Sequence, residues 1–193
     1  TYNHPAPHSW SFSFVGWWLD LCDMGRLKNI IGKVWEEATK PKSHIKGDDF
    51  ENYIRKRIFT SKYYTKVSMT HDYSQNKGDF IDKSKEPDFH FRDKKSGKEF
   101  MVECKFRTYI YGDEGKGKVK WTYPAQLKRY QQTEKQKKIP VFVALGMGDS
   151  NYPDPIFIIP LKKAKYVTLF ESFLDKYEID PDEPLSPKEL FNY

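Results

Sequence analysis

Cysteine is scarce in this sequence: Cys22 and Cys104 are the only two among 193 residues. Their spacing fits no metal-binding motif, and two cysteines are too few for a disulfide framework, so we expect a reducing, cytoplasmic location. Long apolar runs are missing too, because no segment reaches the ~20 apolar residues that cross a bilayer. We therefore expect no stable insertion into a membrane.

Internal repeats, low-complexity tracts and recognition modules such as a helix-turn-helix are also absent from the sequence. The lack of such a module disfavours a site-specific DNA-binding protein of the usual kinds. What the chain has in quantity is aromatic residues, at 17%, and charged residues, at 31%. The aromatic side chains can build a core, which argues against disorder. The net charge of +6 fits an anionic partner such as DNA, and it fits an ordinary solubilising surface equally well.

Three parts are expected along the chain: an aromatic and helix-like N-terminal arm over residues 1–45, one domain over residues 46–180, and an acidic, proline-rich tail over residues 181–193. Pro41 and Gly47 indicate a linker over residues 40–48. The arm has three interpretations that the sequence leaves open. It can pack on the domain as a helix, form a homodimer contact, or anchor the chain at a membrane surface.

Hydrophobic periodicity predicts the elements of the domain. Phe50, Ile54 and Ile58 form one stripe of a helix over residues 48–59, with Asp48 or Asp49 as its N-cap. The other expected elements are helices over 124–138 and 167–179, and strands over 63–69, 88–93, 99–107, 139–146 and 155–161. Strands interleaved with helices predict an α/β fold with a mixed central sheet and helices on both faces.

Two of these strands form a hairpin through "KKSGK" at residues 94–98 and carry charges at fixed places. Side chains alternate between the two faces of a strand, so Glu103 and Lys105 project side by side on one face. Because Phe89 is expected to point into the core, Asp88 faces the other way. Hairpin pairing then brings the carboxylates of Asp88 and Glu103 together.

Two carboxylates held close together repel each other unless a cation lies between them. Carboxylate oxygens suit Mg²⁺ or Mn²⁺, and the backbone carbonyl of Cys104 offers a further ligand. A lysine beside such an ion can orient or deprotonate an attacking water, and we assign this role to Lys105. The alternative is a solvated strand face on which Glu103 and Lys105 are ordinary surface residues.

The pair "PD" at residues 87–88, followed by "ECK" at residues 103–105 on a hairpin, resembles the PD-(D/E)xK nuclease superfamily. The resemblance covers residues 46–179 and implies a restriction endonuclease-like fold. Many members carry an acidic residue on the helix before the first strand, and Glu51 in "DDFENYI" matches it. The Gln-x-x-x-Tyr motif of recombination exonuclease-type branches is matched by Gln126 and Tyr130 in "QLKRYQQ".

This resemblance implies a deoxyribonuclease that depends on Mg²⁺ or Mn²⁺, with Asp88, Glu103 and Glu51 as metal ligands. Gln126 and Tyr130 would support the site or bind the substrate strand, although helix capping and core packing account for these two residues as well. Basic side chains supply candidate phosphate contacts: Lys116, Lys118, Lys120, Lys128 and Arg129. The competing interpretation is a catalytically inactive DNA-binding or scaffold protein of the same fold.

Overall fold

The structure, a computed structural model, describes residues 42–69, 86–108, 110–112 and 117–193. The chain divides into two units, residues 1–41 and residues 42–193, and all described residues belong to the second. The roles predicted for the N-terminal arm, including a homodimer contact, therefore lie outside the described residues. The same holds for Lys116.

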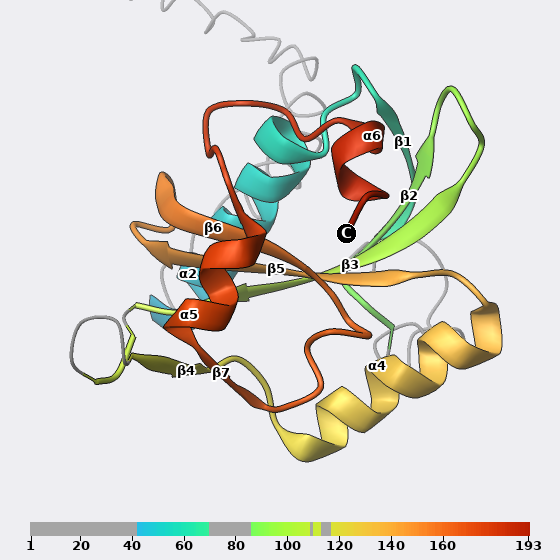
Figure 1. The fold of residues 1–193 in the computed structure, drawn as a ribbon. Helices are drawn as coiled ribbons and strands as arrows, with labels where there is room; N and C mark the ends of the chain where they lie inside the picture. Colours follow the sequence, from blue (N-terminus) through green and yellow to red (C-terminus); the bar gives the residue numbers. More distant parts are fainter. Residues whose placement is uncertain (1–41, 70–85, 109, 113–116) are drawn as a thin grey trace, which may run out of the picture. The chain divides into compact units, whose positions relative to one another are not determined.

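A six-stranded sheet with the order β1-β2-β3-β5-β6-β8 forms the centre of the second unit (Figure 1). Only the pair β3–β5 is parallel among these strands; the other neighbours are antiparallel. The predicted α/β class with a mixed sheet is thus confirmed. The bounds are β1 (Tyr64–Met69), β2 (Phe89–Asp93), β3 (Glu99–Phe106), β5 (Val141–Gly148), β6 (Pro153–Pro160) and β8 (Glu178–Ile179).

Helices cover both faces of the sheet, as predicted. Figure 1 shows α4 (Pro124–Lys137) on one side and α2 (Lys42–Tyr53) with α6 (Pro187–Leu190) on the other. Each face has its own core of buried apolar side chains, and the alternation of β3 divides Val102 from Met101 between them. Among the described residues, no helix is both long and apolar enough to span a bilayer.

The predicted hairpin is confirmed, and its register sets the geometry of the charged residues. Phe89 pairs with Val102, and the pairing continues toward the turn. At the turn, Gly97 adopts a φ of 72°, a left-handed conformation that costs glycine little. The Asp93 carboxylate accepts hydrogen bonds from the backbone N–H groups of residues 95 and 96, which closes the turn locally.

The first helix begins earlier than predicted. It starts at Lys42, so the expected linker over residues 40–48 is wrong and Asp48 and Asp49 lie inside the helix rather than at its N-cap. A single interior glycine, Gly47, costs only about 1 kcal/mol, and the burial of the Phe50 ring offsets it. The chain then tightens into the π-helical segment η1 (Ile54–Ile58), whose two isoleucines are buried as the stripe predicts.

The helix predicted over residues 167–179 is wrong. This segment forms β7 (Thr168–Phe170), α5 (Glu171–Leu174), the 3₁₀ turn η2 (Asp175–Tyr177) and β8. β7 pairs with β4 (Lys118–Lys120), a strand far away in the chain that helical periodicity cannot indicate. The segment expected as a tail also packs on the domain, since Leu185 and Leu190 are buried in the core beside α2.

Candidate functional site

The charged residues of the hairpin gather where β3 loses one of its neighbours. Pairing with β2 ends at Phe89–Val102, while β3 runs on to Phe106 beside β5 alone. At this open edge the backbone N–H of Cys104 donates a hydrogen bond to Asp88 Oδ2 at 2.7 Å. A strand residue directs its N–H and C=O to the same neighbour, so the Cys104 carbonyl also faces this edge.

Glu103 lies beside Asp88 and is held from two directions. Its side chain is buried, and its Oε1 accepts a hydrogen bond of 2.5 Å from the hydroxyl of Tyr130. The same oxygen forms an ion pair with Lys105 Nζ. Since both contacts fall on Oε1, the carboxylate is oriented and Oε2 takes part in neither. Asp88, Glu103, Lys105 and Tyr130 are thus brought together as predicted.

Glu51 reaches this cluster from α2, whose position depends on a glycine of β5. The ring of Phe50 lies against Gly146, where an added Cβ would come within 2.1 Å of it. The adjacent Glu51 is close enough to the cluster for Glu103 and Lys105 to affect its ionisation. Burial, the Asp48 carboxylate and the Glu103 carboxylate raise the pKa of Glu51 to about 7, and Lys105 opposes this rise.

The pKa of Asp88 is raised as well, well above its ordinary value. Burial is the main cause, followed by the carboxylates of Glu103 and Glu51, while Lys105 and the Cys104 N–H oppose it. Burial favours a neutral Lys105, but the neighbouring carboxylates of Glu103 and Asp88 outweigh it and raise the pKa of this lysine. Lys105 is therefore an ammonium group at neutral pH.

Two buried carboxylates, Asp88 and Glu103, share this one ammonium, so the site carries more buried negative than positive charge. The donor set of carboxylate oxygens and a backbone carbonyl fits Mg²⁺ or Mn²⁺. Within the described ranges, no three His, Cys, Asp or Glu side chains are grouped so that they could hold a metal ion. A site at this edge would therefore use two carboxylates, the Cys104 carbonyl and water, as Mg²⁺ commonly does.

The two halves of the Gln-x-x-x-Tyr pattern lie in different surroundings. Tyr130 projects from α4 next to Leu127 into the core and reaches Glu103. Gln126 is in the first turn of the same helix, where its Oε1 accepts a hydrogen bond of 3.0 Å from the hydroxyl of Thr122. The structure therefore links Tyr130 directly to the cluster and links Gln126 to the chain that leads into α4.

The predicted phosphate contacts fall on two elements. Lys118 and Lys120 are exposed on β4, and Lys128 is exposed on α4. Arg129 is half-buried, with its guanidinium carbon 5.2 Å from the ring centroid of Tyr130. Arg129 therefore contacts Tyr130, the tyrosine that donates a hydrogen bond to Glu103.

Arg107 is a residue whose role the sequence did not reveal. Its side chain donates Nε to the Lys120 carbonyl at 2.8 Å and Nη2 to the Trp121 carbonyl. Trp121 is fully buried and stacks on Tyr130 with ring centroids 6.4 Å apart. Strand alternation is a local pattern, and only the fold shows that Arg107 connects β3 to β4.

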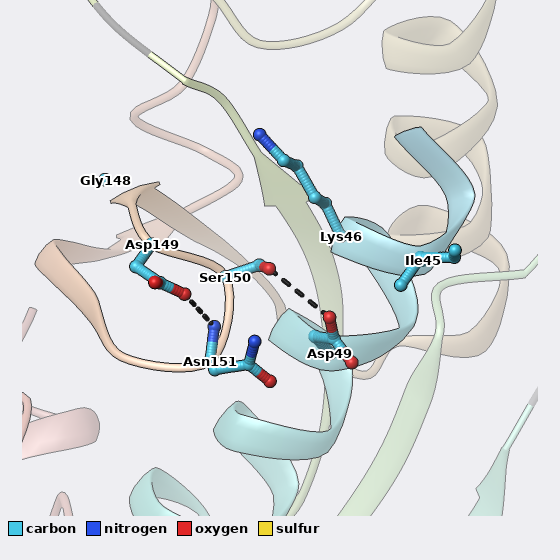
Figure 2. A pocket seen from close by; sticks show the side chains of 7 residues that line it. All are labelled: Ile45, Lys46, Asp49, Gly148, Asp149, Ser150 and Asn151. Carbon is cyan, nitrogen blue, oxygen red and sulfur yellow. Dashed lines mark hydrogen bonds between the residues drawn. The ribbon is translucent and has the colours of Figure 1, made fainter. Parts of the chain in front are cut away.

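A pocket of about 560 Å³ lies elsewhere, between the start of α2 and the loop after β5. Figure 2 shows Ser150 directed toward Asp49, and their oxygens are 3.4 Å apart. None of the predicted site residues lines this pocket. Asp49 and Glu51 are two residues apart on a helix, about 200° around its axis, so the pocket and the cluster use opposite sides of α2.

Comparison with protein-family models finds no match to this chain, and comparison with curated proteins finds none either. The resemblance to PD-(D/E)xK nucleases therefore stays a prediction from the quoted motifs. A functional assignment rests on what the side chains at the open edge of β3 can do.

Proposed function

We propose that this protein is a metal-dependent nuclease of the PD-(D/E)xK type, with a restriction endonuclease-like sheet, that hydrolyses phosphodiester bonds in DNA. The observation that carries the proposal is the meeting of Asp88, Glu103 and Lys105 at the open edge of β3. A solvated strand face does not account for it, because Glu103 is 2% exposed and Asp88 is 9% exposed. Buried carboxylates require a partner cation or a proton.

In this proposal Asp88 and Glu103 would hold Mg²⁺ or Mn²⁺ together with the Cys104 carbonyl, and Glu51 would assist from beside these ligands. A bound divalent ion supplies charge stabilisation to the phosphate oxygens. Tyr130 and Lys105 both contact Oε1 of Glu103, so these two contacts leave Oε2 available. The carboxylates are thus positioned before any ligand arrives, which lowers the cost of ordering them.

Lys105 has the role of a positioned ammonium. Its raised pKa keeps it protonated, so it acts first as a hydrogen-bond donor that orients the attacking water and offsets negative charge at phosphorus. Its pairing with Glu103 places the ammonium beside the metal ligands. Gln126 is assigned to the substrate strand or to the support of α4 through Thr122.

The experiment incubates supercoiled plasmid, linear DNA and RNA of matched sequence with the full chain in Mg²⁺, Mn²⁺ or EDTA. We expect cleavage of DNA in at least one metal and none in EDTA. Asp88→Asn should abolish cleavage, while Asp149→Asn, at a carboxylate of the separate pocket, should cut like the parent. A parent that binds DNA and cuts nothing in any metal supports the DNA-binding or scaffold alternative. Cleavage of RNA alone would overturn the assignment of DNA.

A further inference from the structure

A small two-stranded sheet formed by β4 and β7 stands apart from the main sheet, beside α5 (Figure 1). Val119 pairs with Leu169, and both are buried against the core. The alternate positions point outward, so the pairs Lys118–Phe170 and Lys120–Thr168 share the outer face. This face therefore combines lysine and aromatic side chains.

Two further aromatic residues extend this outer face. Tyr111 pairs with Lys118 on the side away from β7, through backbone hydrogen bonds of 2.9 and 2.8 Å. Tyr111, Lys118 and Phe170 consequently form a row across three chain segments. The Lys120 ammonium lies 4.2 Å from the ring centroid of Tyr123. We call the surface made by Tyr111, Lys118, Lys120, Tyr123 and Phe170 the stacking ribbon.

The three aromatic side chains of the stacking ribbon are each more than half exposed. Tyr111 is 56% exposed, Tyr123 is 59% exposed and Phe170 is 59% exposed. Exposed large rings on neighbouring positions leave apolar area in water, which a ligand can cover favourably. The lysines between them supply positive charge without any described ion pair.

The stacking ribbon is joined to the charged cluster by two contacts. Arg107, two residues after Lys105, holds the carbonyls of Lys120 and Trp121. Trp121 stacks on Tyr130, whose hydroxyl donates to Glu103. A strand advances ~7 Å in two residues, so the end of β4 lies one arginine side chain away from the part of β3 that carries Lys105.

We propose that the stacking ribbon binds the bases of an unpaired DNA strand that leads into the charged cluster. The bases stack on the aromatic rings while Lys118 and Lys120 contact the phosphates. This inference rests on the proposed function for the direction of the strand, and it names single-stranded or frayed DNA as the substrate class. Base–aromatic stacking is independent of sequence because every base presents a flat face.

Two other occupants fit this surface less well. A DNA duplex keeps its base faces stacked inside the helix, so it would leave the three rings uncovered. A protein partner, including a second copy of this chain, is disfavoured by the composition, because lysine is depleted from the centres of protein interfaces. Here Lys118 lies between two aromatic residues, at the middle of the row.

The test measures binding of fluorescein-labelled oligothymidylate and of a blunt duplex of equal length by anisotropy, with the full chain in EDTA. Phe170→Ala and Tyr123→Ala should each weaken oligothymidylate binding about 5-fold or more, since a stacked base is worth ~1–3 kcal/mol. Duplex binding should change less than about 2-fold. The matched control is Tyr152→Ala, a tyrosine that is 53% exposed in the loop after β5 and should bind like the parent.

Conservative variants separate stacking from plain apolar contact. Phe170→Trp should bind oligothymidylate as well as the parent or better, whereas Phe170→Leu should resemble Phe170→Ala. Equal binding by the leucine variant would overturn stacking. Unchanged oligothymidylate binding in both alanine variants, with melting curves like the parent, would also overturn the inference. So would a parent dimer, seen by sedimentation, that Phe170→Ala dissociates, because the ribbon would then be a self-association surface.

The inference and the proposed function fail in different ways. A chain that binds oligothymidylate through the ribbon but cuts no DNA in Mg²⁺ or Mn²⁺ keeps the inference and loses the nuclease assignment. A chain that cuts DNA while both alanine variants bind and cut single strands like the parent keeps the nuclease assignment and loses the inference.

Discussion

The two ends of the β2–β3 hairpin carry charge in opposite ways. Near the turn, Oε1 of Glu99 accepts hydrogen bonds from Nε and Nη2 of Arg92. The other oxygen of this carboxylate, Oε2, lies 2.9 Å from His90 Nε2. At the open end, Asp88 and Glu103 share the ammonium of Lys105. The hairpin thus has one carboxylate, Glu99, whose charge is balanced by neighbouring basic side chains. At its other end two carboxylates, Asp88 and Glu103, have only one ammonium between them.

Burial turns this difference in charge into a difference in chemistry. The Arg92 hydrogen bond lowers the pKa of Glu99, which is partly exposed, so its ionised form is already satisfied. Burial and neighbouring carboxylates raise the pKa of Asp88 instead. A matched surface carboxylate has no need of a ligand, whereas an unmatched buried one gains stability by binding a cation. The comparison therefore separates a structural ion pair from a candidate metal site.

The largest expected effect concerns cleavage. Lys105→Ala should lower the rate of DNA cleavage by about 10²–10⁴-fold, because the variant has no positioned donor at the reacting phosphate. Arg92→Ala, which removes the cation at the turn end, should cut like the parent. Single-turnover cleavage with saturating Mn²⁺ measures both variants. Equal cleavage rates for Lys105→Ala and the parent would show that Lys105 has no catalytic role.

A smaller effect is expected in the stability of the metal-free protein. Asp88→Asn keeps an acceptor for the Cys104 N–H and removes a charge that the fold disfavours, so at pH 8 it should raise the free energy of unfolding by about 1 kcal/mol or more. That corresponds to ~2–4 °C per kcal/mol in melting temperature for a domain of this size. Glu99→Gln should instead lower stability slightly, within ~1 kcal/mol. If Asp88→Asn is less stable than the parent, the expected difference between these two carboxylates is wrong.

The pH dependence of stability gives the third contrast. The folded-state pKa of Glu51, about 7, exceeds its usual value of 4.5, so the folded state binds more protons and metal-free stability should fall as pH rises from 4.5 to 7. For Glu99 the lowered pKa gives the reverse sign, with stability decreasing as pH falls through it. Urea unfolding across this range should show a flatter profile for Glu51→Gln. If Glu51→Gln leaves the pH profile of stability unchanged, Glu51 is not the cause of the pH dependence.

Metal should reverse the first of these trends. Mn²⁺ needs ionised ligands, so its stabilising effect should increase with pH over the same window. Melting curves of the parent with and without Mn²⁺ measure this effect, and Asp88→Asn should show little response to the ion. Glu99→Gln serves as the control and should respond like the parent.

The smallest effect concerns the salt dependence of DNA binding. If Lys128 and Arg129 each bind a phosphate, replacing either one by alanine should reduce the slope of log K against log salt by about 1. Lys137 already pairs with Glu86 at 2.5 Å, so Lys137→Ala should change the slope less. Equal slopes for all three variants would show that Lys128 and Arg129 do not contact phosphates and are ordinary surface charges.

Local patterns in the sequence were sufficient for the hairpin, α4 and the buried strand β5. The alternation around Glu103 and the glycine in the turn act between residues that are close in the chain, so the facing of Asp88, Glu103 and Lys105 could be predicted. The stripe of Phe50, Ile54 and Ile58 was predictable for the same reason. These features follow from the period of a helix or a strand.

Only the tertiary structure decided the features that depend on distant partners. Residues 167–179 have a helical pattern, yet β7 pairs with β4 because Leu169 and Val119 are buried together. Other contacts also join segments that are far apart in the chain. Tyr130 donates a hydrogen bond to Glu103, Arg107 binds the Lys120 carbonyl of β4, and Tyr111 pairs with Lys118 in the stacking ribbon. Sequence periodicity reports which face a side chain occupies. Which distant group it meets there, and how deeply both are buried, is set by the packing of the whole domain.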